Sequence, residues 1–137
     1  MGVEPFLLSS AVIAVVGQRL LRTVCPACKE VEPATEAMLD VFGVKLNPDH
    51  PPPVMASGAG CSKCAGRGMR GRTAVYEIMQ MSDKLRAMTL ERTAGSQLRA
   101  QAVAEGMLTM REAGLRKALE GVTTLEEVTR MLFTDDF

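Results

Sequence analysis

The spacing of apolar residues predicts two strands far apart in the chain. Residues 12–24 are rich in β-branched side chains, and although neither face of this segment is uniformly apolar, it favours a strand. Apolar residues alternate more clearly over residues 72–81, which predict a second strand. Residues 3–11 begin with an acidic residue and a proline, a combination suited to the first turn of a helix.

From residue 82 onward the apolar period becomes helical. Leucine and alanine residues recur at helical spacing within residues 83–90 and 96–105. Two capping-box patterns follow, in which a threonine precedes a glutamate by three residues: Thr109 to Glu112, and Thr124 to Glu127 with the overlapping alternative Thr123 to Glu126. The sequence therefore predicts a tail of four short helices separated by glycines.

The segment between the two predicted strands differs in composition. Prolines and glycines interrupt it repeatedly, and only residues 34–42, followed by Gly43, have the pattern of a short helix. We expect the rest of residues 25–64 to be loop. A segment so often interrupted by proline and glycine needs another source of order.

All four cysteines of the chain lie in this segment, in two C-x-x-C pairs. Cys25 and Cys28 form the first pair, and Cys61 and Cys64 form the second. Each pair places two sulfurs on one tight turn, and two such turns complete a tetrahedral set of four thiolates, which suits zinc. Four protein ligands leave no open coordination position, so we expect one structural Zn²⁺ per chain and no metal-based hydrolysis.

Three other interpretations of the cysteines stay open. Two disulfides would require an oxidising compartment, whereas the sequence has no recognisable export signal. A thioredoxin-like redox pair would explain one C-x-x-C but not two. Four thiolates could also hold an iron–sulfur cluster.

Composition limits the function classes. The 137 residues are 47% hydrophobic and 23% charged, which is typical of a globular protein, and the formal net charge is zero. A balanced charge and an aromatic content of 4% argue against a general nucleic-acid-binding protein. The most apolar run, residues 6–16, is shorter than the ~20 residues of a spanning helix. We therefore expect a cytoplasmic protein.

A basic cluster lies beside the second cysteine pair and consists of Lys63, Arg67, Arg70 and Arg72. Its simplest interpretation is compensation of the −2 charge of a tetrathiolate zinc site, with partner contact as the alternative. The cluster overlaps a near match to the phosphate loop, residues 66–73, in which Arg72 replaces the lysine. A phosphate loop opens a helix, whereas this segment precedes a predicted strand, so we expect no nucleotide site here.

Four segments of the chain together resemble the C-terminal portion of the type II secretion and type IV pilus assembly ATPases. One of them enters the cysteine-containing insertion, another leaves it, and one lies in the predicted helical tail. The matching segments are Gly2 to Leu8, Gln18 to Lys29 (QRLLRTVCPACK), Cys61 to Glu77 (CSKCAGRGMRGRTAVYE), and the tail residues around Gly106, Gly114 and Gly121 to Val128 (GVTTLEEV).

The resemblance implies an α+β fold in three parts. Residues 1–24 would be the end of a RecA-like ATPase core and contribute its edge strands, residues 25–71 a tetracysteine zinc-binding insertion, and residues 72–137 a strand followed by a C-terminal helical bundle. The family's zinc ligands carry over to Cys25, Cys28, Cys61 and Cys64. The phosphate loop and the Mg²⁺-binding acids of the family would lie upstream of Met1.

The resemblance also implies partners and a location. The parent would be a hexameric ATP- and Mg²⁺-dependent enzyme at the cytoplasmic face of the inner membrane, where it binds a polytopic platform protein. This chain would be a non-catalytic module, associated with the membrane only through its partners and binding no nucleic acid. Two alternatives stay open: a zinc-ribbon module that binds nucleic acid, and a cysteine-rich chaperone module like that of Hsp40-type co-chaperones, whose C-x-x-C-x-G-x-G unit residues 61–68 match.

Overall fold

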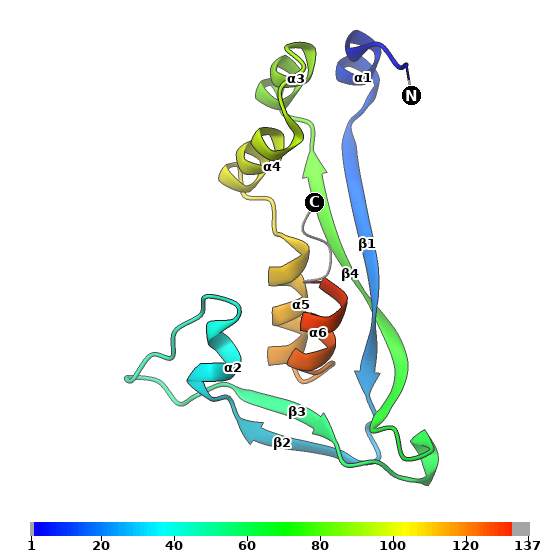
Figure 1. Ribbon diagram of the computed structural model, residues 1–137, viewed down its shortest axis with the longest axis vertical. Helices are drawn as coiled ribbons and strands as arrows, with labels where there is room; N and C mark the ends of the chain where they lie inside the picture. The colour runs from blue at the N-terminus through cyan, green and yellow to red at the C-terminus, as the bar shows by residue number, and fades with distance from the viewer. Residues whose placement is uncertain (1, 133–137) are drawn as a thin grey trace. The chain divides into compact units, whose positions relative to one another are not determined.

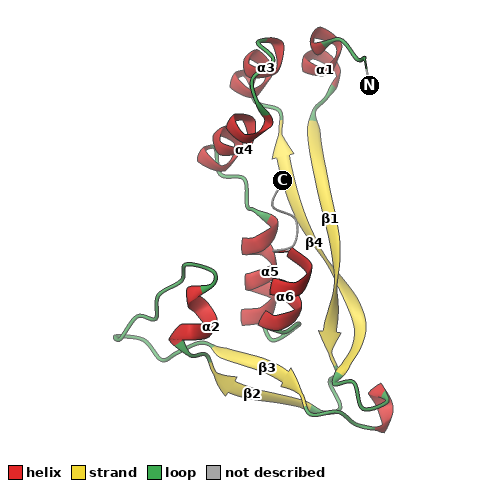
Figure 2. Ribbon diagram, in the orientation of Figure 1, coloured by secondary structure: helices red, strands yellow, loops and turns green. Residues whose placement is uncertain are grey.

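The computed structural model describes residues 2–132 and mixes helices with strands (Figure 1, Figure 2). In chain order its elements are α1 (Pro5–Ala11), β1 (Ala14–Val24), β2 (Lys29–Pro33), α2 (Glu36–Asp40), β3 (Val54–Gly58), the 3₁₀ turn η1 (Ser62–Cys64), β4 (Met69–Gln80), α3 (Asp83–Leu90), α4 (Gly95–Ala104), α5 (Met110–Leu119) and α6 (Leu125–Leu132). The α+β class expected from the sequence is confirmed at this level.

The chain divides into two compact units, which are described separately. One unit comprises the chain up to Gly17 together with Tyr76–Thr109, and the other comprises Gln18–Val75 and the chain from Met110 onward. Strands β1 and β4 pair in a two-stranded sheet, and each strand contributes residues to both units. The expected division of this chain into three parts at residues 24 and 71 stays a prediction.

The first unit is built on helices α1, α3 and α4. Helix α1 packs against α3, and α3 against α4, around the buried side chains of Leu85 and Ala102. The Arg86 guanidinium donates a hydrogen bond to the Ser9 carbonyl, which ties α3 to α1. Many large apolar side chains of this unit are nevertheless exposed, chiefly along α1 and the start of β1, where Phe6 is 69% exposed and Ile13 81%.

The second unit holds the larger core. Its buried side chains come from strands and helices that are distant in sequence: Leu21, Ala34, Leu39, Met55, Val75, Leu115, Ala118, Val128 and Leu132. Helices α5 and α6 pack closely at Gly114, where a Cβ atom would lie 2.9 Å from Val128 Cγ1. Helix α5 also contacts β3, so the insertion between β1 and β4 shares a core with the helices of the tail.

The expectation that the insertion is loop outside one helix was wrong. Strands β2 and β3 form an antiparallel pair with Lys29 opposite Gly58 and Pro33 opposite Val54. All five side chains of β2 are exposed, whereas Met55 and Ala56 of β3 are buried. Sequence analysis missed β2 because this strand has no buried face and therefore shows no alternation of apolar and polar residues.

The other sequence-based elements agree with the structure to within a few residues. The predicted strands correspond to β1 and β4, the predicted short helix corresponds to α2, and the predicted tail helices correspond to α3, α4, α5 and α6. Within the described residues, no helix is both long enough and apolar enough to cross a membrane.

Candidate metal centre

Two tight turns carry the four cysteines, and both lie in the second unit. Cys25 directly follows β1, and the Cys28 N–H donates to the Cys25 carbonyl at 3.2 Å, which closes the first turn. The second turn is η1, in which the Cys64 N–H donates to the Cys61 carbonyl at 3.2 Å. Ala65 then adopts a left-handed conformation with φ of 51°, which reverses the chain toward β4.

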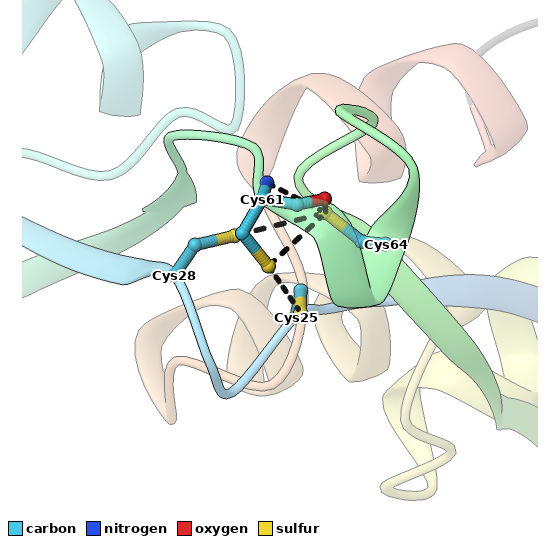
Figure 3. A group of neighbouring side chains, drawn as sticks. All are labelled: Cys25, Cys28, Cys61 and Cys64. Carbon is cyan, nitrogen blue, oxygen red and sulfur yellow. Dashed lines mark hydrogen bonds between the residues drawn. The ribbon is translucent and has the colours of Figure 1, made fainter.

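The four sulfur atoms lie together (Figure 3). The distance from sulfur to sulfur is 3.9 Å between Cys25 and Cys61, 3.8 Å between Cys28 and Cys64, and 3.8 Å between Cys61 and Cys64. All four atoms fall within 4.8 Å of one another. A tetrahedral ion with metal–sulfur bonds of about 2.3 Å would separate its sulfurs by about 3.8 Å. The cluster could therefore hold one metal ion, and its donor set is consistent with zinc.

Backbone N–H groups surround one of the sulfurs. The N–H groups of Cys61 and Gly68 each donate to Cys64 Sγ at 3.2 Å. The hydrogen bond from Cys61, and secondarily that from Gly68, holds the pKa of the Cys64 thiol down to about 6, because both bonds stabilise the thiolate. Desolvation instead raises the pKa of Cys28 to about 12. Two backbone N–H groups therefore stabilise the thiolate form of Cys64.

Two glycines let the backbones on either side of the cluster cross at close range. A Cβ atom at Gly58 would overlap the Gly68 carbonyl oxygen, and a Cβ at Gly68 would overlap the Gly58 carbonyl. The Gly68 carbonyl also accepts a hydrogen bond of 2.9 Å from the Cys25 N–H. The crossing therefore links the end of β3 and the chain leaving η1 to the first cysteine turn.

The predicted basic cluster has exposed side chains throughout. Lys63 lies in η1, Arg70 and Arg72 lie in β4, and the Arg67 guanidinium donates through Nε to the Cys64 carbonyl at 3.2 Å. Arg67 is therefore the member of the cluster that contacts a cysteine residue directly. The near phosphate-loop pattern enters strand β4 rather than a helix, as expected from its context.

Sequence reasoning missed a second constellation beside the cysteines. Glu127 of α6 is buried, with 2% of its side chain exposed, and accepts hydrogen bonds from two arginines. Arg22 of β1 donates through Nη2 at 2.8 Å and Nε at 3.1 Å, and Arg130 donates through Nη2 at 2.8 Å and Nε at 3.2 Å. The Arg22 backbone N–H also donates to Glu127 Oε1 at 3.0 Å.

These contacts shift the ionisation of both partners. Burial by itself raises the pKa of Glu127, but the hydrogen bonds from Arg22 and Arg130 outweigh it and lower the pKa to about 2. The pKa of Arg22 is raised, chiefly by its hydrogen bond to Glu127.

The capping box predicted for Thr124 and Glu127 is only half formed. The Glu127 N–H donates to Thr124 Oγ1 at 3.1 Å, while the Glu127 carboxylate binds arginines instead of the helix backbone.

A cavity of about 280 Å³ lies against this constellation, entirely within the second unit. Its lining combines the three charged side chains just described with the chain that leaves the second cysteine turn: Arg22, Ser57, Gly58, Arg67, Gly68, Met69, Thr124, Glu126, Glu127 and Arg130. The ionic contacts of α6 and the surroundings of the cysteines are therefore neighbours in space.

Comparison with known proteins gives consistent matches over nearly the whole chain. The family model described as "Type II/IV secretion system protein" matches residues 1–130. Type II secretion system protein E of Pseudomonas aeruginosa is 42% identical over 96% of this chain, which covers 25% of that relative. The type IV pilus assembly ATPases PilB of Thermus thermophilus and Myxococcus xanthus are each 40% identical, over 93% and 100% of this chain. The chain spans 14% and 24% of those two relatives.

Proposed function

The chain belongs to the type II/IV secretion system protein family, and on that premise we propose that it is a metal-stabilised, non-catalytic module of a secretion or pilus assembly ATPase. Its role would be to shape the ATPase ring or to present a docking surface to the inner-membrane platform protein. The observation that carries the proposal is the convergence of four cysteine sulfurs in a chain of this family.

The proposed ion is Zn²⁺, held by Cys25, Cys28, Cys61 and Cys64. Sulfur separations of 3.8 and 3.9 Å are those expected around one ion, and four thiolates are a preferred donor set of zinc. When bound, the ion would cross-link the two turns. Its apparent binding free energy would be on the order of 10–16 kcal/mol and would contribute to folding. The exposed cations Lys63, Arg67, Arg70 and Arg72 would offset the −2 charge of the filled site.

The proposal assigns no ATP hydrolysis to this chain alone. Its relatives are about four times as long or longer, and the segment of this chain most like a phosphate loop continues into strand β4. ATP and Mg²⁺ would be bound by other parts of a full-length parent. We expect ATP turnover of the purified chain to equal the buffer background, and turnover that Arg72→Ala abolishes would contradict this assignment.

The exposed apolar side chains of the first unit support a place at the edge of a larger core. Val3, Phe6, Leu7 and Ile13 are each more than half exposed, and a group of large exposed apolar side chains in one short segment favours contact with a partner. We propose that the RecA-like core of the ATPase covers this surface in the hexamer. The module would then be held at the cytoplasmic face of the inner membrane through the platform protein.

Docking is tested by co-purification of the chain with the cytoplasmic domain of the platform protein. We expect the wild-type chain and Ser62→Ala to retain the platform domain, because Ser62 shares the second cysteine turn without supplying a sulfur. Cys61→Ser removes one proposed ligand and should abolish retention. Retention of the platform domain by none of the three proteins, or equally by all three, would contradict the proposal.

A further inference from the structure

The residues that lead into the first cysteine turn are held on one side by the helical tail. The Val24 N–H donates to the Val122 carbonyl at 2.9 Å, and Thr123 Oγ1 donates to the Arg22 carbonyl at 2.7 Å. The backbone N–H of Arg22 is bound by Glu127. Two of the three residues before Cys25, Arg22 and Val24, are thus fixed through contacts with residues about 100 positions later in the chain.

The same residues are held on the other side by the chain that leaves the second cysteine turn. Thr23 Oγ1 donates to the Arg70 carbonyl at 2.5 Å, and the Cys25 N–H donates to the Gly68 carbonyl. Gly68 in turn donates its N–H to Cys64 Sγ. Hydrogen bonds on both sides of residues 22–25, together with the covalent chain between them, therefore connect the tail to a sulfur of the second turn.

Glu127 occupies the centre of the tail's attachment. Its carboxylate binds both the backbone and the side chain of Arg22, and it is 2% exposed, so loss of its charge would leave two guanidinium groups without their anion. Thr123 is fully buried and makes the adjacent contact to the same residue. The attachment is therefore both ionic and tightly packed.

We infer that Glu127 is a positioning residue of the metal centre: through Arg22 it fixes the strand end that presents Cys25 and Cys28 to Cys61 and Cys64. Glu127 touches no sulfur and supplies no ligand. It acts by reducing the number of positions that the first cysteine turn can adopt relative to the second. The inference rests on the proposed metal centre and extends it to a residue in helix α6.

Thermodynamic linkage makes this coupling reciprocal. If docking of α6 raises the affinity for the ion, then the bound ion must stabilise the docking of α6 by the same factor. Removal of the ion should therefore loosen α6, although the nearest cysteine is more than 60 positions away in sequence. Positioning therefore predicts that the ion protects α6 more than it protects the helices of the first unit, in addition to any general effect on stability.

The affinity test uses the full chain at pH 7, with reductant, in a zinc competition against a chromogenic chelator. We expect Glu127→Gln to weaken zinc binding by about fivefold or more, which is the lower end of the usual coupling between sites. Glu77→Gln is the matched control, because Glu77 also binds an arginine, Arg99, but lies in the first unit. It should leave the affinity unchanged.

A second pair of variants applies if Glu127→Gln does not fold. Thr123→Val removes the hydrogen bond to Arg22, and Thr129→Val removes a bond of 2.9 Å that stays within α6. We expect only Thr123→Val to weaken zinc binding. In the wild-type chain, addition of a chelator should increase amide hydrogen exchange in α6 relative to α3.

Distinct outcomes separate the two proposals. A wild-type chain that binds no zinc overturns both the metal centre and this inference. A wild-type chain that binds zinc, with the affinities of Glu127→Gln and Thr123→Val less than about fivefold below those of their controls, overturns the inference and leaves the metal centre in place. Exchange in α6 that does not respond to the chelator also overturns the inference.

Discussion

Near the cysteines, Gly58 and Gly68 are the residues at which an added methyl group would clash most severely with the opposite backbone. The carbonyl oxygen of Gly68 occupies the space of a Gly58 Cβ, and this oxygen cannot move away without losing its hydrogen bond from the Cys25 N–H. Gly58 does not have a positive φ, so the effect of a substitution there would come from the clash and not from backbone strain.

Gly58→Ala should therefore destabilise the chain by about 2 kcal/mol or more, as overpacking against rigid backbone does. Urea denaturation of the metal-loaded protein measures the change. Gly95→Ala is the control, because a Cβ at that position in α4 meets nothing within 4 Å, and we expect it to be neutral or slightly stabilising. Equal effects of the two substitutions would contradict the close crossing.

Glu127 gives the stability of the chain a defined pH dependence. Its pKa is about 2 in the folded chain, below the ordinary value of 4.5, so the unfolded chain binds the proton more tightly. Its contribution is complete above about pH 4.5 and is lost as the pH falls toward 2. The difference corresponds to about 3 kcal/mol, which screening of the half-exposed arginines reduces to about 2 kcal/mol.

The comparison of wild type with Glu127→Gln isolates this contribution when it is made at a zinc concentration that saturates both proteins at each pH, since their zinc affinities are expected to differ. We expect the difference in their free energies of unfolding, measured in urea, to be constant from pH 7 to about 5 and to narrow below pH 4.5. A difference that stays constant down to pH 3 would show that the carboxylate charge contributes nothing.

Sequence patterns were sufficient to predict that the cysteines meet, but they were insufficient to predict the contacts of Glu127. Two C-x-x-C pairs have few uses in proteins, so their spacing alone predicted that four sulfurs meet, and they do. Glu127 matched a capping box, which is a local pattern. Its carboxylate instead binds Arg22, 105 positions earlier in the chain, and no local pattern contains that contact.

A threonine directly before the first residue of helix α6 caps the helix. Thr124 Oγ1 accepts the Glu127 N–H, and this bond satisfies one of the N–H groups that a helix leaves unpaired at its first turn. The same bond orients the residue whose side chain attaches the helix to β1. The cap therefore serves both the local stability of α6 and its docking.

Thr124→Ala should cost about 1 kcal/mol in the free energy of unfolding, whereas Thr124→Ser should cost a few tenths at most, because serine caps equally well. Urea denaturation at pH 7 distinguishes them. If the two variants are equally destabilised, the methyl group of Thr124, and not its hydroxyl, makes the contribution.

At the scale of elements, helices were easier to predict than the strands of the insertion. The tail helices repeat apolar residues at the helical period because each buries one face, for example through Val128 and Leu132. Strand β2 buries no side chain and ends at Pro33, so neither periodicity nor composition reveals it. Its pairing with β3 depends on the two cysteine turns, which bring Lys29 and Gly58 together.

For the molecule as a whole, the exposed apolar side chains of the first unit predict self-association of the isolated chain. Phe6→Ser combined with Ile13→Ser should reduce association in sedimentation velocity without lowering the midpoint of thermal unfolding, because both side chains are largely exposed. Val31→Ser is the control, since Val31 is 61% exposed but lies in the insertion. Association that only Val31→Ser reduces would place the contact surface on the insertion instead.

The most direct test of the account is X-ray absorption at the zinc edge, together with metal analysis, on the reduced chain purified without chelator. We predict one zinc per chain with four sulfur neighbours at about 2.3 Å and no nitrogen or oxygen neighbour. A chain that contains no metal and yet keeps its fold, or zinc bound to fewer than four sulfurs, would contradict the central claim that Cys25, Cys28, Cys61 and Cys64 close around a single ion.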